Sequence, residues 1–404
     1  MPVLLSEPEK LAPVPGIRLA SCNANIYRNE RDDLFLMEIA PGGNSAVVQT
    51  KNVFAAAPVI VTRKHLQSHR PGYCLVNAGN ANAGTGDRGI EDALECCKEI
   101  ARVTGCEVEK VLPFSTGVIG EYLPVQNISA VVEGLVASLH EDRWLDCARA
   151  MMTTDTVAKG ASRTVKVSGK EIVISGIAKG SGMIRPDMAT MLAYIATDAV
   201  IEQSLLDQLL QEAVDSSFNR ICVDGDTSTN DACLLVASGA SAVEPGSDST
   251  ELAEFSAALN ELCIELAQAI VRDGEGATKF ITVEVNGAAS EKLCREVAYD
   301  IATSPLVKTA MFASDPNWGR IIAAIGRSRA DELEAENISV SINDVRVLER
   351  GGLSDSYTEE AGQREMNRQE IHLVIELGSG EYGYTAWTCD LSHDYVSINA
   401  DYRS

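Results

Sequence analysis

The chain of 404 residues is poor in aromatic side chains, in positive charge and in histidine. Phe, Trp and Tyr make up only 5% of it, so its core must be built from small aliphatic residues. Lys and Arg number 34 against 58 Asp and Glu, and the formal net charge of −24 argues against nucleic acid or an anionic membrane as a partner. The five histidines form no HExxH motif, and no GxSxG elbow occurs. We therefore expect chemistry that uses neither a metal nor a histidine base.

Long hydrophobic runs and paired cysteines are also missing. The longest apolar stretch, VFAAAPVIV at 53–61, is far below the roughly 20 residues that span a bilayer. Glu7 and Glu9 make the N-terminus unlike a targeting peptide. The eleven cysteines show neither CxxC pairs nor the spacing of zinc ligands. These features predict a cytoplasmic protein with reduced cysteines.

The chain does contain an alternation of apolar strand-like runs and amphipathic helical runs, which is typical of α/β folds. We expect strands and the start of a helix within 33–40 and 44–62, and further strands within 72–84, 107–120, 232–239, 278–287, 338–343 and 370–377. Helices are expected within 90–105, 201–221 and 257–274, and the segment 291–313 is expected to belong to the C-terminal domain. The turn-prone segment 241–254 is expected to be an exposed connection. Because the length exceeds that of one ordinary hydrophobic core, we divide the chain into a catalytic domain at 1–284 and a smaller α/β domain at 285–404.

One glycine-rich motif, GTGDRG at 84–89, follows a predicted strand and precedes a predicted helix. That context fits a dinucleotide-binding turn. However, the acidic residue that should end the next strand is missing, because Phe114 and Ser115 close that strand. We favour a structural turn at a helix N-terminus and keep nucleotide binding as an alternative.

The most unusual stretch is AKGSGMIRPDMATML at 178–192, where a threonine follows an alanine behind a glycine-rich approach. If the bond between Ala189 and Thr190 were cut, the freed α-amino group, with a reference pKa of about 7.7–8.0, could take the Thr190 hydroxyl proton at neutral pH. Gly180 and Gly182 permit a strained backbone, and Ala189 offers little steric obstruction. The stretch predicts a self-cleaving chain with a threonine nucleophile.

The chain resembles the ornithine acetyltransferases of arginine biosynthesis, which are autoprocessed glutamate N-acetyltransferases. The motifs that carry the resemblance are AAPV at 56–59, NAGNANAGTG at 77–86, STGVIGE at 115–121, MTTDT at 152–156, KGSGMIRPDMATML at 179–192, GDTSTND at 225–231, DPNWGR at 315–320 and YVSINADYRS at 395–404. The resemblance implies a layered α/β sandwich of the autoproteolytic N-terminal-nucleophile type, similar to aminopeptidases. It also implies that the tail of the C-terminal domain lines the active site.

The resemblance further implies cleavage between Ala189 and Thr190, with Thr190 as the nucleophile that carries an acetyl group from N2-acetylornithine to glutamate. Thr116 and Gly117 would form the oxyanion hole, since a hydroxyl and an N–H fixed by a glycine turn can aim at a developing oxyanion. The implied substrate contacts are Thr153 (or its neighbour Thr154), Lys179, Thr190, Glu275, Asn399 and Ser404.

Charge gives these contacts a physical purpose. A protein at −24 repels glutamate and the carboxylate of acetylornithine unless its site is locally positive. Lys179 is the candidate for the carboxylate, and Glu275 could pair with the ammonium group of the substrate. We therefore expect one site to hold a zwitterion by both ends.

The resemblance implies no cofactor, leaves acetyl-CoA open as a second acetyl donor, and suggests an assembly of two α and two β chains. Two other functions stay open at this point. An autoproteolytic aminopeptidase or amidase would use water as the acceptor, and a processed, non-catalytic binding protein would transfer nothing. Nucleotide binding through GTGDRG is the remaining alternative.

Overall fold

The computed structural model describes residues 2–27, 30–185, 191–246, 250–328 and 333–400. The chain divides into a larger compact unit, 6–219 with 226–270, and a smaller one, 1–5 with 220–225 and 271–404. The predicted domain boundary at 284/285 falls inside strand β11 (Phe280–Ala288). That strand is paired on both sides, with β15 (Glu370–Glu376) and β16 (Tyr382–Cys389), so the boundary cannot lie there. It lies instead between Ile270 and Val271.

The larger unit contains two β-sheets. The four-stranded sheet has the order β1 (Ile17–Cys22), β2 (Leu34–Ile39), β4 (Tyr73–Asn77), β5 (Val111–Ser115). The five-stranded sheet has the order β3 (Asn44–Gln49), β10 (Ala232–Ala237), β8 (Leu192–Thr197), β7 (Lys170–Lys179), β6 (Lys159–Val167). The strands predicted in this unit are present as β2, β3, β4, β5 and β10, whereas β1, β6, β7 and β8 were not predicted.

One face of each sheet contributes to a shared hydrophobic core. Phe35 of β2 and Phe114 of β5 both pack edge-on against the ring of Tyr194 of β8, with centroid distances of 5.2 and 5.4 Å. Each such aromatic contact stabilises by about 0.5–1.5 kcal/mol beyond the area it buries. The two sheets therefore pack face to face as a sandwich.

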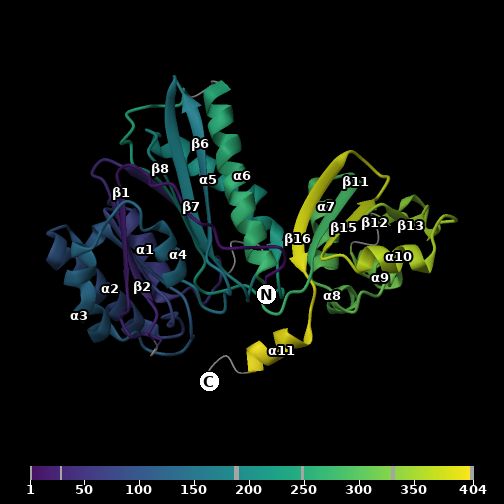
Figure 1. Ribbon diagram of the computed structural model, residues 1–404, viewed down its shortest axis with the longest axis horizontal. Helices are drawn as coiled ribbons and strands as arrows, with labels where there is room; N and C mark the ends of the chain where they lie inside the picture. The colour runs from purple at the N-terminus through teal and green to yellow at the C-terminus, as the bar shows by residue number, and fades with distance from the viewer. Residues whose placement is uncertain (1, 28–29, 186–190, 247–249, 329–332, 401–404) are drawn as a thin grey trace. The chain divides into compact units, whose positions relative to one another are not determined.

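Helices cover the outer faces of this sandwich (Figure 1). Against the four-stranded sheet lie α1 (Ala57–Leu66), α2 (Gly86–Thr104) and α3 (Val125–Ala137). Against the five-stranded sheet lie α5 (Gln203–Ser216) and α6 (Thr250–Arg272). A Cβ added to Gly176 of β7 would lie 3.0 Å from Leu262 of α6, so the missing side chain permits this close approach. The resulting order of helix, sheet, sheet and helix confirms the predicted layered α/β fold.

The unanticipated hairpin of β6 and β7 closes through a tight two-residue turn. Val167 pairs with Lys170, and the residues between them, Ser168 and Gly169, have φ values of 50° and 77°. Two successive positive φ angles match the right-handed twist of a hairpin. The turn leads β7 back to Lys179, the residue at which this strand ends.

Helix α6 begins earlier than predicted. Its first residue, Thr250, lies inside the segment that we expected to be an exposed connection. Glu251 in the first turn favours helix formation there, because its negative charge lies at the positive end of the helix dipole. Phe255 is fully buried, so the first turns are held by packing as well.

The smaller unit is built on a seven-stranded sheet. Its order is β14 (Gly352–Leu353), β13 (Val345–Glu349), β12 (Ser339–Ile342), β15, β11, β16 and β9 (Ile221–Cys222). Its helices are α7 (Glu291–Ala302), α8 (Pro305–Phe312), α9 (Trp318–Arg327), α10 (Glu359–Met366) and α11 (His393–Ala400). The predicted α/β character of the C-terminal part is confirmed. Within the described residues, no helix has an apolar run long enough to cross a membrane.

Candidate active site

The predicted oxyanion residues follow β5 directly. Gly117 has a φ of 134°, and a Cβ there would lie 2.2 Å from the carbonyl carbon of Gly79. Only glycine fits this close approach of two backbones. The N–H of Thr116 donates to the Asn77 carbonyl at 2.9 Å, and no acceptor takes the Gly117 N–H among the residues that the structure describes. The turn thus offers a preset hydrogen-bond donor.

Asparagine side chains hold this turn in place. Asn230 Nδ2 donates to the carbonyl oxygens of Ala81 and Ser115, at 2.6 and 2.8 Å. Asn77 Nδ2 donates to the Asn80 carbonyl at 2.8 Å. The motif GDTSTND therefore supports the STG turn through Asn230.

Lys179 lies at the end of β7 and is only 6% exposed. Its Nζ donates to Thr153 Oγ1 at 2.8 Å and to Thr116 Oγ1 at 3.4 Å. Since Lys179 occupies a lone pair of the Thr116 oxygen, the hydroxyl hydrogen is directed to another acceptor, and the positive charge makes it a stronger donor. Three predicted site residues are thus brought together, and Thr153 rather than Thr154 makes the contact with Lys179.

A buried carboxylate that we did not predict joins this group. Asp155 Oδ2 lies 3.8 Å from Lys179 Nζ and accepts from the Thr153 N–H at 2.9 Å. Its Oδ1 accepts from Lys159 Nζ at 2.7 Å and from the Gly180 N–H at 2.8 Å. Burial opposes ionisation, but the ammonium groups of Lys159 and Lys179 outweigh it and hold the pKa of Asp155 well below its usual range.

We call Thr116, Thr153, Asp155, Lys159 and Lys179 the lysine cluster. Lys159 starts β6, and its side chain is fully buried against Asp155. Asp155 stands within the motif MTTDT, so the motif contained the signal for it. The sequence gave no comparable signal for Lys159, because a lone lysine is most often a solvated surface charge.

A second buried acid, Asp231, directly precedes β10. It is 1% exposed, and its Oδ2 has no hydrogen-bond partner within the described part of the chain. Burial raises the pKa of Asp231 well above its usual value, although the N–H of Met191, the charge of Lys179 and the hydroxyl of Thr50 act in the opposite direction. The buried carboxyl of Asp231 is therefore harder to ionise than an exposed one.

Three predicted residues, Ala189, Thr190 and Ser404, lie outside the described residues. The cleavage site, the nucleophile and the terminal contact therefore remain predictions. Met191, which follows Thr190 in the chain, is described: its carbonyl accepts from the Ala232 N–H at 3.0 Å.

The two predicted contacts of the smaller unit lie together. Asn399 of α11 donates from Nδ2 to Glu275 Oε2 at 2.7 Å. Glu275 is buried, and the adjacent Gly276 has a φ of 70°. A Cβ at Gly276 would meet Ser392 Oγ and Tyr395 N at 2.6 Å, so glycine lets the loop approach the start of α11. The Glu275 carboxylate and the Asn399 side-chain amide therefore lie next to each other in the smaller unit.

The space beside the glycines of the GTGDRG turn is filled by side chains of the turn and of the residues just before it. A Cβ at Gly89 would lie 1.9 Å from Thr85 Oγ1 and 2.6 Å from Asn82 Oδ1. Thr85 in turn donates to Asn82 Oδ1 at 2.9 Å, and Asn82 Nδ2 donates to the Gly89 carbonyl. These contacts support the structural turn over the nucleotide site. The DPNWGR motif is structural in the same sense, because Arg320 ties α9 to the Leu306 carbonyl at 2.8 Å.

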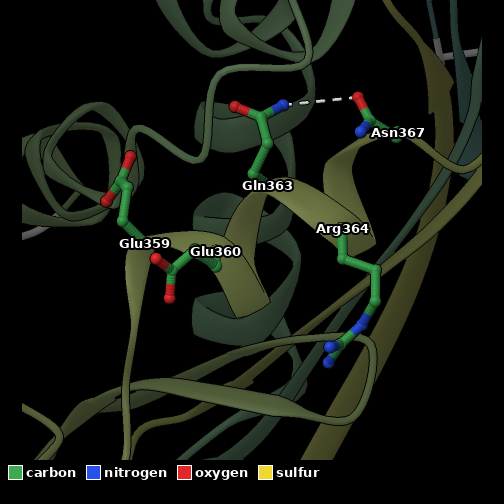
Figure 2. Close-up of a pocket in the computed structure, with 5 residues that line it drawn as sticks. All are labelled: Glu359, Glu360, Gln363, Arg364 and Asn367. Atoms are coloured by element: carbon green, nitrogen blue, oxygen red, sulfur yellow. Dashed lines mark hydrogen bonds between the residues drawn. The ribbon is translucent and has the colours of Figure 1, made fainter.

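A surface depression elsewhere follows one face of α10 (Figure 2). Its lining residues are all exposed: Glu359, Glu360, Gln363, Arg364 and Asn367. Gln363 donates to Asn367 Oδ1 at 3.3 Å, and the other three side chains present charges of both signs. Such a solvated helix face holds no group prepared for catalysis. Among the described residues, no cluster of His, Cys, Asp and Glu could hold a metal ion.

Fold and site together define a class: layered α/β proteins in which a hydroxyl and an ammonium group meet where the strands of two packed sheets end. The chain matches the ArgJ family over residues 18–404. It therefore belongs to that family.

The arginine biosynthesis bifunctional protein ArgJ of Methylococcus capsulatus is 52% identical over 398 residues, which cover 98% of this chain and 97% of that protein. The protein of the same name from Psychrobacter arcticus is 50% identical over 400 residues and 98% of each chain. The crystal structure of the Bacillus halodurans protein of that name is 41% identical, with a TM-score of 0.48 over 50% of this chain and 95% of that one.

Proposed function

We propose that this chain transfers an acetyl group from N2-acetylornithine to glutamate, through an ester on Thr190, to give ornithine and N-acetylglutamate. The observation that carries the proposal is the contact of the Lys179 ammonium with the hydroxyls of Thr116 and Thr153. The names of the relatives, which place them in arginine biosynthesis, support the substrate class.

In the proposed first half-reaction, Thr190 Oγ attacks the acetyl carbonyl of the donor. Its proton goes to the α-amino group of Thr190, which cleavage after Ala189 has freed and whose reference pKa of about 7.7–8.0 suits this role. The negative charge that develops on the carbonyl oxygen is met by the Thr116 hydroxyl and the Gly117 N–H. The α-amine then returns the proton to the leaving nitrogen, and ornithine departs.

In the second half-reaction, the amino group of glutamate attacks the acetyl ester. The same amine removes the proton from the attacking nitrogen, and the same donors stabilise the oxyanion. Thr190 leaves with its hydroxyl restored. No cofactor is required, and acetyl-CoA would acylate Thr190 by the same attack on a thioester.

Substrate recognition is proposed to follow charge. Lys179 would bind the carboxylate that acetylornithine and glutamate share, which suits a buried ammonium in a protein of net charge −24. Glu275, Asn399 and Ser404 keep their predicted role as contacts for the rest of the substrate. We further propose that cleavage gives an α and a β chain and that two of each assemble.

The test is to incubate purified protein with glutamate and acetylornithine and to quantify N-acetylglutamate and ornithine, with acetyl-CoA in a parallel reaction. Equal amounts of both products are expected over many turnovers when glutamate is present, and without glutamate about one ornithine per enzyme molecule, from acetylation of Thr190. Release of ornithine and acetate without glutamate would instead identify an amidase. Product from acetyl-CoA would identify a bifunctional enzyme.

A further inference from the structure

The buried side chain of Asn230 uses both hydrogens of its amide on backbone carbonyls. Nδ2 donates to the Ser115 carbonyl at 2.8 Å and to the Ala81 carbonyl at 2.6 Å. Its Oδ1 accepts from the Thr229 hydroxyl at 2.6 Å, which fixes the orientation of the amide. The two Nδ2 bonds join residue 230 to segments that lie 115 and 149 residues earlier in the chain.

The first of these bonds holds the peptide that leads into the oxyanion turn. The Ser115 carbonyl and the Thr116 N–H belong to the same planar peptide. The N–H donates to the Asn77 carbonyl at 2.9 Å, and the carbonyl accepts from Asn230 on the opposite edge. This peptide is therefore fixed from both sides, directly before the Thr116 side chain.

The second bond reaches the chain on the other side of Gly117. The Ala81 N–H donates to the Val118 carbonyl at 2.9 Å, and the Ala81 carbonyl accepts from Asn230. Ala81 thus passes the constraint on to Val118, the residue after Gly117. The amide of Asn230 holds the turn at its start directly and at its end through one intermediate residue.

The next two residues, Asp231 and Ala232, hold the chain beside the predicted nucleophile. The Ala232 N–H donates to the Met191 carbonyl at 3.0 Å, and the Asp231 carboxyl accepts from the Met191 N–H. Met191 is bonded directly to Thr190 in the chain. One short segment, 230–232, therefore contacts both the oxyanion turn and the residue that follows Thr190.

The need for such a link comes from the two sheets. Thr116 follows β5 of the four-stranded sheet, whereas Thr190 precedes β8 of the five-stranded sheet. Oxyanion donors act when they lie about 2.7–3.1 Å from the oxygen that gains charge, and a misplacement of about 1 Å can lower the rate by about 10²-fold. A contact that spans the two sheets is therefore a direct way to set this distance.

We propose that Asn230 is a positioning residue: its side-chain amide holds the turn of Thr116 and Gly117 at the distance from Thr190 that acetyl transfer requires. This inference rests on the proposed function. Because the oxyanion forms only after the nucleophile has attacked, loss of the Asn230 amide should affect the transition state and leave substrate binding nearly unchanged.

The test is Asn230→Ala with steady-state kinetics on acetylornithine and glutamate. We expect kcat to fall by about 10²-fold, with each KM within about threefold of wild type. Rates are divided by the fraction of chains cut after Ala189, so that a cleavage defect is not counted as a turnover defect. A wild-type kcat in the folded variant, or a change confined to KM, would overturn the inference.

The matched control is Thr62→Val, which removes a buried hydrogen bond from the same strand. Thr62 is fully buried, and its hydroxyl donates at 2.8 Å to the carbonyl of Pro113, two residues before Ser115 in β5. Its kcat should stay within about threefold of wild type once the folded fraction is corrected for. A loss as large as that of Asn230→Ala would mean that any weakening of β5 lowers turnover, which contradicts a specific role for Asn230.

A double variant, Asn230→Ala/Thr116→Ala, tests whether Asn230 acts through the turn. If it does, the two losses overlap, and the kcat of the double variant should lie within about tenfold of that of the slower single variant. Losses that multiply in full would show that Asn230 acts elsewhere. If Asn230→Ala fails to fold, Asn230→Ser keeps one donor and should lose about tenfold in kcat; a wild-type kcat there is equally incompatible with the inference.

Hydrogen exchange followed by mass spectrometry needs neither cleavage nor turnover. The peptide that contains Thr116 and Val118 has both backbone N–H groups bonded, to the carbonyls of Asn77 and Gly79. Its exchange should be at least about tenfold faster in Asn230→Ala and unchanged in Thr62→Val. Unchanged exchange in Asn230→Ala would refute the inference, whereas wild-type protein that forms no N-acetylglutamate would refute the proposed function instead.

Discussion

Both units of the protein bury lysines, but they give them different partners. In the larger unit, Lys159 and Lys179 share the carboxylate of Asp155. In the smaller unit, Lys308 of α8 is 3% exposed and donates to Thr388 Oγ1 at 2.9 Å and to the carbonyl of Cys389. In both units a buried lysine donates to a threonine hydroxyl, but a carboxylate joins the contact only in the larger unit.

The two sites differ in which parts of the chain supply the partners of the lysine. The oxygens around Lys308 belong to one strand, β16, so the ammonium links α8 to that strand and has a structural role. The lysine cluster instead gathers residues after β5, after α4 (Trp144–Ala150) and at the ends of β6 and β7. One of its threonines, Thr116, directly precedes Gly117, whose backbone is fixed by the turn. Both units therefore bury a lysine, but the arrangement that we propose to be catalytic lies in the larger unit.

The largest effect is expected from Lys179→Met. Loss of the ammonium removes the proposed carboxylate contact and the polarisation of Thr116, so kcat/KM for acetylornithine should fall by about 10²- to 10³-fold. Lys308→Met should change kcat/KM by less than about threefold once the folded fraction is corrected for. Steady-state kinetics on both variants tests the comparison. Equal losses would remove the functional distinction between the two lysines.

The two threonines sharpen the same comparison. Thr116→Ala should lower kcat by about 10²-fold with little change in KM, as removal of one oxyanion donor does. Thr388→Ala should leave kcat nearly unchanged and lower the free energy of unfolding by about 1–3 kcal/mol, because it leaves the Lys308 ammonium with one partner fewer. Turnover kinetics and urea unfolding together check the pair. Wild-type turnover in a folded Thr116→Ala protein would place the oxyanion donor elsewhere.

Two buried aspartates of the larger unit should respond to pH in opposite ways. The pKa of Asp155 is lowered on folding, so its stabilisation is present above the unfolded pKa of about 3.9 and is lost as the pH falls below it. The pKa of Asp231 is raised, so its contribution falls as the pH rises above about 4.

Urea unfolding between pH 3 and pH 8 measures both effects. Asp155→Asn should flatten the loss of stability on the acid side, and Asp231→Asn should flatten the decline on the neutral side. If the free energy of unfolding changed with pH in the same way in both variants, the two carboxyl groups would not differ in their charge state.

A smaller effect is expected from Asn399→Ala in the smaller unit. Its amide donates to Glu275, and loss of one neutral donor from a substrate contact should raise the KM for acetylornithine by about three- to tenfold at an unchanged kcat. Asn367→Ala, on the exposed face of α10, is the matched control. An unaltered KM in Asn399→Ala would end the predicted role of this residue in binding.

Much of the layered fold could be predicted from the alternation of apolar runs, and α2 shows why. Its apolar positions recur at helical spacing, and the helix ends at Gly105, which has a φ of 75°. The β6–β7 hairpin was missed because its polar and β-branched residues mix without strict alternation. The domain boundary was missed because β11 pairs with strands that lie about a hundred residues later, and nothing local indicates such pairing.

The site was predicted in part. The motif resemblance named Thr116, Thr153 and Lys179, and the structure brings their side chains together. Asp155 was overlooked although it stands within the motif MTTDT. Lys159 was missed because its importance comes from burial, which a sequence read residue by residue does not display. A charge is informative only when its surroundings are known.

The most direct test of the central claim is mass spectrometry of the protein under denaturing conditions, before and after brief exposure to acetylornithine. The account predicts two chains, of 189 and 215 residues (404 − 189 = 215), with one added acetyl group on the peptide that begins at Thr190. Thr190→Ala should stay a single, unlabelled and inactive chain, and Thr190→Ser should still cut. An active protein that remains uncut, or an acetyl group found only on another peptide, would contradict the account.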